Sequence, residues 1–260
     1  MSTKGWKKFP YPEKQYDYAG DALKKNWARL HKGDCEPWPE SAAVQDAWRA
    51  YHAGDFAGAF EAGIKAGGAG ISAANKAAMI QATYMVDDDD AKTEIFQQII
   101  ARAEAQQKDM PEAVNAWYFH AYALGRYSQQ ISVGEALTKG LGGKIRASLE
   151  KTLELAPDHA EAHIALAAFQ SEVIDKVGSL VGGLTYGAKK DSALEHFETA
   201  LELIPFSAIA RMEMANGLVL LFGKSRMKKA EELYAQAAEC EAAEAMERLD
   251  VEAAKAELED

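Results

Sequence analysis

Two stretches of this chain repeat one pattern of helix, proline and second helix, and this repetition constrains the fold more than any other feature. The first stretch begins at Lys144 and reads KIRASLEKTLELAPDHAEAHIALAAF, and the second begins at Lys190 and reads KDSALEHFETALELIPFSAIARMEMANGL. In both, a predicted helix ends in Leu-Glu-Leu-x-Pro, and a new helix is predicted two or three residues later. Proline cannot continue a helix, but it suits the first turn of the next one. The repetition therefore predicts stacked helix pairs.

Apolar residues elsewhere in the chain recur at the helical spacing i, i+3, i+4 and i+7. Between residues 145 and 155, for example, one helix face carries Ile145, Leu149, Thr152 and Leu153. The alternation of Val, Ile and Thr that is typical of strands is absent. Hydrophobic residues make up 48% of the 260 residues, which is enough for a continuous core. The expected fold class is all-α.

Small residues also flank a large residue at a fixed spacing within the repeats, which lets two helices approach closely around one bulky side chain. This pattern resembles the tetratricopeptide repeat (TPR) family, whose repeat spans about 34 residues. The resemblance covers roughly residues 40–240 and is strongest over 144–238. In the best-matching repeat, the small, large, small and proline positions are Ala193, Phe197, Ala200 and Pro205. Leu149 and Pro157 match the large and proline positions one repeat earlier. Ala230, Tyr234 and Ala237 match the small, large and small positions one repeat later.

The resemblance implies a right-handed α-solenoid of about five helix pairs with a capping helix at each end. Residues 1–40 are interpreted as an N-terminal extension whose capping helix lies within residues 16–31, and residues 41–240 as the repeat array. Residues 241–260 are strongly acidic, and we interpret them as the C-terminal capping helix, because a terminal repeat needs a polar outer face.

Two inserts depart from the repeat pattern, because each adds residues between the two helices of a pair. They read ISVGEALTKGLGG from Ile131 and VGSLVGGLTYGA from Val177. Long loops in compact domains are often functional. The second insert is therefore predicted to be either a lid over a pocket, formed by Leu180, Leu184 and Tyr186, or a packed connector.

In TPR proteins the first helices of the pairs line a concave groove, and the resemblance implies that nine residues line a partner groove here. They are Trp48, Tyr51, His52, Asn115, Tyr118, Tyr122, Arg126, Met212 and Asn216. Tyr118, Tyr122 and Arg126 are spaced by four, so they form one stripe on one helix face. Tyr, Trp and Arg concentrate binding energy in interfaces. The alternative is that these aromatic residues pack against neighbouring helices.

No motif predicts catalysis, a cofactor or a metal. The run from Gly217 to Ser225 resembles a phosphate-binding loop, but it has one residue too many and ends a helix at Gly223. The acidic run 87–90 lacks the alternation of a calcium loop and suits the start of a helix. His31 and Cys35 have no second ligand pair at zinc spacing. The chain is therefore not expected to be an enzyme.

The formal net charge of -11 argues against binding to nucleic acid or to an anionic membrane surface. It favours a basic partner or one that is bound through apolar contacts. The chain has two cysteines, far apart, no secretory signal and no apolar segment of about 20 residues, so neither membrane insertion nor secretion is expected. These features predict a cytoplasmic location.

The leading hypothesis is a non-catalytic, bacterial-like interaction scaffold that binds a protein or peptide partner in the groove. The alternative is a small-ligand-binding protein that resembles the TPR component of tripartite transporters, with the Gly-rich inserts forming a pocket or lid. Homodimerisation through terminal helices is a further possibility that the sequence leaves open.

Overall fold

The computed structural model describes residues 2–259, and this part of the chain is helical with no strand. The expected all-α fold class is therefore confirmed. The chain forms two compact units. Unit 1 comprises residues up to 31, residues 35–155 and residues 243–246, and unit 2 comprises residues 32–34, residues 156–242 and the residues from 247 onward. The division at residues 40 and 240 stays a prediction.

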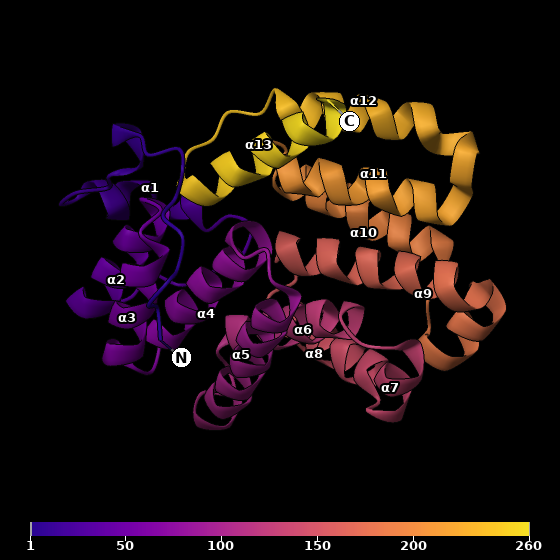
Figure 1. The fold of residues 1–260 in the computed structure, drawn as a ribbon, viewed down its shortest axis with the longest axis horizontal. Helices are drawn as coiled ribbons and strands as arrows, with labels where there is room; N and C mark the ends of the chain where they lie inside the picture. Colours follow the sequence, from indigo (N-terminus) through magenta and orange to yellow (C-terminus); the bar gives the residue numbers. More distant parts are fainter. Residues whose placement is uncertain (1, 260) are drawn as a thin grey trace. The chain divides into compact units, whose positions relative to one another are not determined.

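Unit 1 contains the N-terminal helix and three helix pairs, which are α2 with α3, α4 with α5, and α6 with α8 (Figure 1). The first helices of these pairs contact one another in turn, α2 with α4 and α4 with α6, as in a repeat array. The bounds are α1 (Ala22–Leu30), α2 (Ala42–His52), α3 (Phe56–Ala66), α4 (Gly70–Ile80), α5 (Asp89–Asp109), α6 (Val114–Gln129), α7 (Val133–Thr138) and α8 (Leu141–Leu155).

Unit 2 contains two further pairs, α9 with α10 and α11 with α12, and the first helices α9 and α11 again pack together. Most of the last helix, α13, belongs to the same unit. The bounds are α9 (Ala160–Tyr186), α10 (Lys190–Leu203), α11 (Ala208–Phe222), α12 (Met227–Ala238) and α13 (Ala245–Glu259). The described residues thus contain five helix pairs, the number that the sequence predicts.

The small and large positions of the repeat pattern meet as expected in unit 2. Ala193, Phe197 and Ala200 of α10 are fully buried. Gly217 of α11 faces the ring of Phe197 so closely that a Cβ atom there would lie 2.3 Å from Cε2. A small residue on one helix therefore makes room for a large one on the next, which explains why both types recur.

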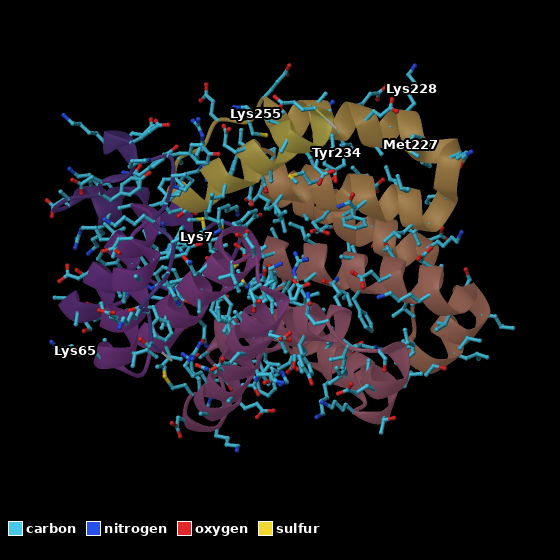
Figure 2. The ribbon with its side chains drawn as sticks, viewed as in Figure 1. Lys7, Lys65, Met227, Lys228, Tyr234 and Lys255 are labelled. Carbon is cyan, nitrogen blue, oxygen red and sulfur yellow. The ribbon has the colours of Figure 1, made fainter. Side chains whose placement is uncertain are left out.

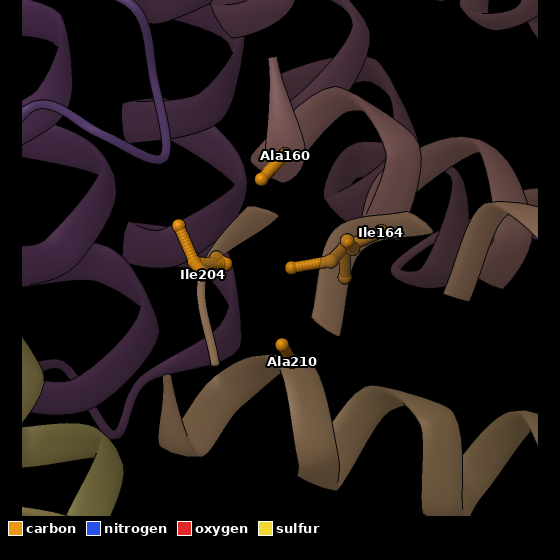
Figure 3. Packing of buried hydrophobic residues seen from close by; sticks show 5 residues of the cluster. Ala160, Ile164, Ile204 and Ala210 are labelled. Carbon is orange, nitrogen blue, oxygen red and sulfur yellow. The ribbon is translucent and has the colours of Figure 1, made fainter. Parts of the chain in front are cut away.

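The junction between α9, α10 and α11 is filled by small and branched apolar side chains. Figure 3 shows Ala160 and Ile164 of α9 facing Ala210 of α11, with Ile204 beside them. Ile204 directly follows α10 and precedes the proline that closes the pair. The residue before the repeat proline thus fixes the turn by burying its side chain under both helices.

Local sequence signals set several helix ends. Asp88 is the N-cap of α5 and accepts a hydrogen bond from the Ala91 amide at 2.8 Å, so the acidic run begins a helix, as predicted. Ser207 caps α11 in the same way through the Ala210 amide, at 3.2 Å. Gly223 follows α11 with a positive φ of 58°, as predicted for a helix end rather than a phosphate-binding loop.

The two inserts are more ordered than the prediction of loops or a lid. The first insert contains the short helix α7. The second continues α9 to Tyr186 after a break at Gly178, where φ is 80°. Glycine has low helix propensity, but Gly182 is buried and contacts Val173, so tertiary packing overrides propensity here.

Candidate partner-binding surface

The stripe on α6 joins a buried anchor to two half-exposed residues. Tyr118 is buried, and its ring centroid lies 6.2 Å from that of Tyr122. Tyr122 and Arg126 are both half-buried. The Arg126 guanidinium lies 5.2 Å from the centre of the Tyr122 ring, and its Nε donates to the Tyr122 hydroxyl at 3.2 Å. The three residues thus form one connected row on a helix face, and Tyr122 and Arg126 are its partly exposed members.

A π-helical turn of residues Gln81–Met85 continues α4 and supports this stripe. The Thr83 hydroxyl lies 2.9 Å from the Tyr122 hydroxyl, so the two groups share a hydrogen bond. Single π-helical turns within helices occur frequently at functional sites. Here the turn brings the Thr83 hydroxyl to Tyr122, whose hydroxyl also accepts from Arg126.

Trp48, Tyr51 and His52 of α2 are fully buried by other parts of unit 1. Part of the cover comes from α1 and the loop after it. The Trp27 and Trp48 ring centroids lie 6.0 Å apart, and those of His31 and Trp48 lie 4.6 Å apart. Trp48 therefore packs in the manner of the alternative hypothesis, against a neighbouring helix.

Residues 243–246, about two hundred residues further along the chain, also cover these positions. The Glu244 carboxylate forms a short hydrogen bond with His52 Nδ1, and both side chains are buried. Tyr51 donates its hydroxyl to Met246 Sδ at 3.0 Å. Tyr18 of the N-terminal extension donates to the Ala243 carbonyl at 2.7 Å. The positions that were expected to hold a partner thus hold a segment of the same chain.

The charges around Glu244 favour its ionised form. Burial alone raises the pKa of Glu244, but His52, Lys76 and His31 together outweigh this effect, and its pKa lies below the usual range of a glutamate. Lys76 is itself only 1% exposed, and its Nζ lies 5.9 Å from the centre of the Tyr51 ring. A carboxylate is therefore buried beside basic side chains, inside a protein of strongly negative net charge.

Asn115, at the start of α6, is also covered by the N-terminal part of the chain. Its side-chain amide donates to the carboxylate of Glu36 at 2.6 Å, and both side chains are buried. The Glu36 carbonyl accepts from the Trp27 indole at 2.8 Å. The loop after α1 therefore closes this end of the predicted groove.

The two predicted groove residues of unit 2 differ in exposure. Met212 is buried in a cluster with Ala208, Ala237, Val251 and Ala254, so α13 covers it. Asn216 is exposed, and its side-chain oxygen accepts from the hydroxyl of Tyr234, labelled in Figure 2, at 2.7 Å. Of the nine predicted groove residues, only Tyr122, Arg126 and Asn216 therefore retain substantial exposure.

Two of the three predicted lid residues are exposed. Leu180 and Leu184 are 76% and 82% exposed, so they face solvent. Tyr186 is half-buried, and its ring centroid lies 6.3 Å from that of Phe169 on the same helix. Helical folding of the insert turns its apolar residues outward instead of laying them over a cavity.

Sequence reasoning missed the polar residues near His52, namely Glu244, Lys76 and His31. No sequence signal connects a glutamate in an acidic C-terminal helix to a histidine in the first repeat. The helical spacing of apolar residues could have placed Lys76 on α4. It could not show that residues 72–80 of this helix are all buried.

No three His, Cys, Asp or Glu side chains between residues 2 and 259 are arranged to hold a metal ion. His163 and His196 form a pair in unit 2, with their Nδ1 atoms 2.7 Å apart. No helix in this range is both long and apolar enough to cross a membrane.

Comparison with known proteins identifies the fold. No family model matches the sequence, and no curated protein matches it. A solved structure of a thermophilic TPR protein from Thermus thermophilus is similar to this chain with a TM-score of 0.56. The alignment covers 82% of this chain and 97% of that chain at 13% sequence identity. The chain therefore has a TPR-like fold, as predicted.

Proposed function

We propose that this protein is a non-catalytic interaction scaffold that binds a protein or peptide partner on the stripe of Tyr118, Tyr122 and Arg126. The observation that carries the proposal is the half-exposed pair of Tyr122 and Arg126, placed beside the π-helical turn on a TPR-like fold. Tyrosine and arginine are the residue types that most often dominate binding energy at interfaces.

The stripe is held in place before any partner arrives. Tyr122 is fixed by Thr83 on one side and by Arg126 on the other. A side chain that is already ordered loses less conformational entropy on binding, so more of its contact energy contributes to affinity. The guanidinium also carries hydrogen-bond donors that suit a carboxylate. We therefore expect a partner that places an acidic group over Arg126.

The small-ligand alternative is not favoured, because the residues that would form its lid are exposed on a helix. Nucleic acid is not a proposed partner, since the net charge of -11 would repel phosphates. Homodimerisation and a cytoplasmic location stay predictions.

The test is an affinity capture from native lysate followed by mass spectrometry, with the wild type compared with Tyr122→Ala/Arg126→Glu. Arg146→Glu on α8 is the matched control, because it makes the same charge change at a half-exposed residue that pairs with Glu150 in its own helix. Circular dichroism would check that both variants remain folded.

We expect a protein that the wild type and Arg146→Glu both capture and that the stripe variant loses. Equal capture by all three proteins would contradict the proposed surface. Loss by both variants would indicate a general charge effect and would also contradict it.

A further inference from the structure

Unit 2 exposes a group of aliphatic side chains near the end of α9. After the break at Gly178, the last part of this helix carries Leu180, Val181 and Leu184, and each of the three is more than half exposed. Their spacing of i, i+1 and i+4 places them on one helix face. Single exposed apolar residues are ordinary, but an exposed apolar patch marks a site of contact with a protein or a membrane.

The turn between α11 and α12 lies at the same end of unit 2 as this patch. Ile164 and Ala210 bring the first parts of α9 and α11 together. Ile174, further along α9, shares a cluster with Leu221 near the end of α11, so the two helices run in parallel. The Nζ atom of Lys190 donates to the Leu221 carbonyl at 2.5 Å, which joins the turn after α9 to the end of α11.

Both turns are positively charged. Residues 176–190 contain three lysines, residues 223–229 contain three lysines and an arginine, and neither range contains an aspartate or a glutamate. These two ranges are here called the basic end of unit 2. Met227, labelled in Figure 2 with Lys228, adds an exposed apolar side chain between two of the cations. The exposed cations of the basic end are Lys176, Lys189, Lys224, Arg226, Lys228 and Lys229.

Only part of this charge is balanced by neighbouring carboxylates. Lys176 forms an ion pair with Glu172, and Lys229 forms one with Glu232. No carboxylate among residues 2–259 pairs with the other three lysines that are exposed there, Lys189, Lys224 and Lys228. Because charges more than about 8 Å apart are largely screened at physiological salt, a partner at this surface is attracted by the local cations. The net charge of -11 describes the whole chain and not this end of it.

Cations around an exposed aliphatic patch match the chemistry of an anionic bilayer surface. Aliphatic side chains enter the boundary between headgroups and acyl chains, and lysine and arginine are attracted by the negative charge of the headgroups. Leu180 and Leu184 are suited to the first role, and the exposed lysines are suited to the second. Nucleic acid also offers phosphates, but it has no apolar layer in which the two leucines could be buried.

We propose that the basic end of unit 2 binds the surface of an anionic lipid bilayer, with Leu180 and Leu184 in the interface and the surrounding cations on the headgroup phosphates. This inference reverses the expectation drawn from net charge, because the charge of this surface is opposite to that of the whole chain. The surface does not include the stripe of unit 1, so this inference and the proposed function can fail independently.

The test is vesicle flotation of the full-length protein. Vesicles of phosphatidylcholine alone are compared with vesicles of equal amounts of phosphatidylcholine and phosphatidylglycerol. Leu180→Ser/Leu184→Ser removes the apolar contact, and Lys224→Glu/Lys228→Glu reverses two charges. All four residues are exposed, so both variants should remain folded, which circular dichroism would check.

Each variant has a matched control that makes the same chemical change at exposed residues outside the basic end. Ile64→Ser/Leu258→Ser is the control for the leucines. Lys65→Glu/Lys108→Glu, on two helices of unit 1, is the control for the lysines. Both controls should bind vesicles as the wild type does.

The wild type should bind vesicles that contain phosphatidylglycerol at least about tenfold more tightly than vesicles of phosphatidylcholine alone. Each charge near the surface changes binding by about a factor of five, so Lys224→Glu/Lys228→Glu should weaken it at least about thirtyfold. Leu180→Ser/Leu184→Ser should weaken it at least about tenfold, since two aliphatic side chains no longer enter the interface.

Three results would overturn the proposal. The first is a wild type that shows no preference for anionic vesicles. The second is a control that loses as much binding as its matched variant. The third is a loss with the lysine variant but not with the leucine variant, which would mean adsorption by charge alone.

A fluorescent polyglutamate peptide tests the other class of occupant. If the wild type binds this peptide through Lys224 and Lys228 but does not bind anionic vesicles, the basic end recognises an acidic protein segment and the bilayer proposal is wrong. Tyr122→Ala/Arg126→Glu should bind vesicles as the wild type does, whether or not it loses a captured protein.

Discussion

In unit 1 the first helices bury aromatic and charged side chains, whereas in unit 2 they bury alanine, isoleucine and leucine. The buried set of unit 1 includes Trp48, Tyr51, Lys76 and Glu244, and all five tryptophans of the chain lie in this unit. The core of unit 2 is typified by the cluster around Ile164. The two units thus share one helix arrangement but use different interactions to hold it.

This difference separates two kinds of stability. The apolar core of unit 2 depends on volume and fit, so its variants should respond to the size of a side chain. The interior of unit 1 depends on partnered charges, so its variants should respond to the loss of one partner. Tryptophan fluorescence reports on unit 1 alone, and circular dichroism reports on both units.

The largest effect is expected in the apolar core of unit 2. Phe197→Ala removes a fully buried ring from between α10 and α11 and should lower the free energy of unfolding by about 4 kcal/mol. Chemical denaturation followed by circular dichroism would measure the loss. A loss below about 1 kcal/mol would mean that the repeat's large position does not hold this unit together.

The charged interior of unit 1 should give the next largest effect. Glu244→Ala leaves His52 and Lys76 buried without their carboxylate and should cost about 3 kcal/mol. Denaturation followed by tryptophan fluorescence would measure it. Glu150→Ala on α8 of the same unit, where an exposed carboxylate pairs with Arg146 of that helix, should cost less than about 1 kcal/mol. Equal losses would argue against a special role for the buried pair.

Close helix crossings should show smaller effects in both units. A Cβ atom at Gly63 would lie 2.5 Å from the Gly70 carbonyl oxygen, and one at Gly217 would lie 2.3 Å from the Phe197 ring. Gly63→Ala and Gly217→Ala should each cost about 2 kcal/mol by overpacking. Because a side chain yields more easily than backbone does, Phe197→Leu should relieve only Gly217→Ala.

Gly125→Ala on α6 is the control for these substitutions, since nothing lies within 4 Å of its Cβ position. It should leave stability unchanged or raise it by up to about 1 kcal/mol through helix propensity. Thermal unfolding of the three variants would order them, and a destabilised Gly125→Ala would contradict the crowding argument.

Helix caps should behave alike in the two units. Asp88→Ala in unit 1 and Ser207→Ala in unit 2 each remove one acceptor for a helix amide and should cost about 1 kcal/mol. Chemical denaturation would measure both, with fluorescence used for Asp88→Ala and circular dichroism for Ser207→Ala. A large difference between the two losses of stability would mean that the contribution of a helix cap depends on the surrounding core.

The sequence predicted the features that depend on local spacing, and these are clearest in unit 2. The positions of Ala193, Phe197 and Ala200, the acidic start of α5 and the end of α11 at Gly223 all follow from short-range rules. The contact of Glu244 with His52 could not be predicted, because it depends on the path of the chain over 192 residues. The second insert was left open as a lid or a packed connector, and its course as a continuation of α9 after a break at Gly178 could not be told from its mixture of apolar residues and glycines.

The smallest predicted effect concerns pH and the histidine pair of unit 2. His163 Nε2 lies 2.9 Å from the Pro157 carbonyl, which only accepts, so this nitrogen carries the hydrogen. The Nδ1 atom of His163 then accepts from His196 Nδ1 at 2.7 Å. Burial, together with the charge of His163, lowers the pKa of His196, although Glu195 opposes the shift.

Because the folded pKa of His196 lies below its unfolded value, the unfolded chain binds more protons once the pH falls toward and below about 6.5. Stability from this pair is therefore present above that pH and is lost on acidification. Denaturation at about pH 7.5 and about pH 5.5, followed by circular dichroism, should show a larger loss for the wild type than for His196→Gln. His120 of unit 1, whose pKa burial also lowers, titrates in both proteins and cancels from the comparison. An equal loss of stability in the wild type and in His196→Gln would mean that the histidine pair does not make unit 2 sensitive to acid.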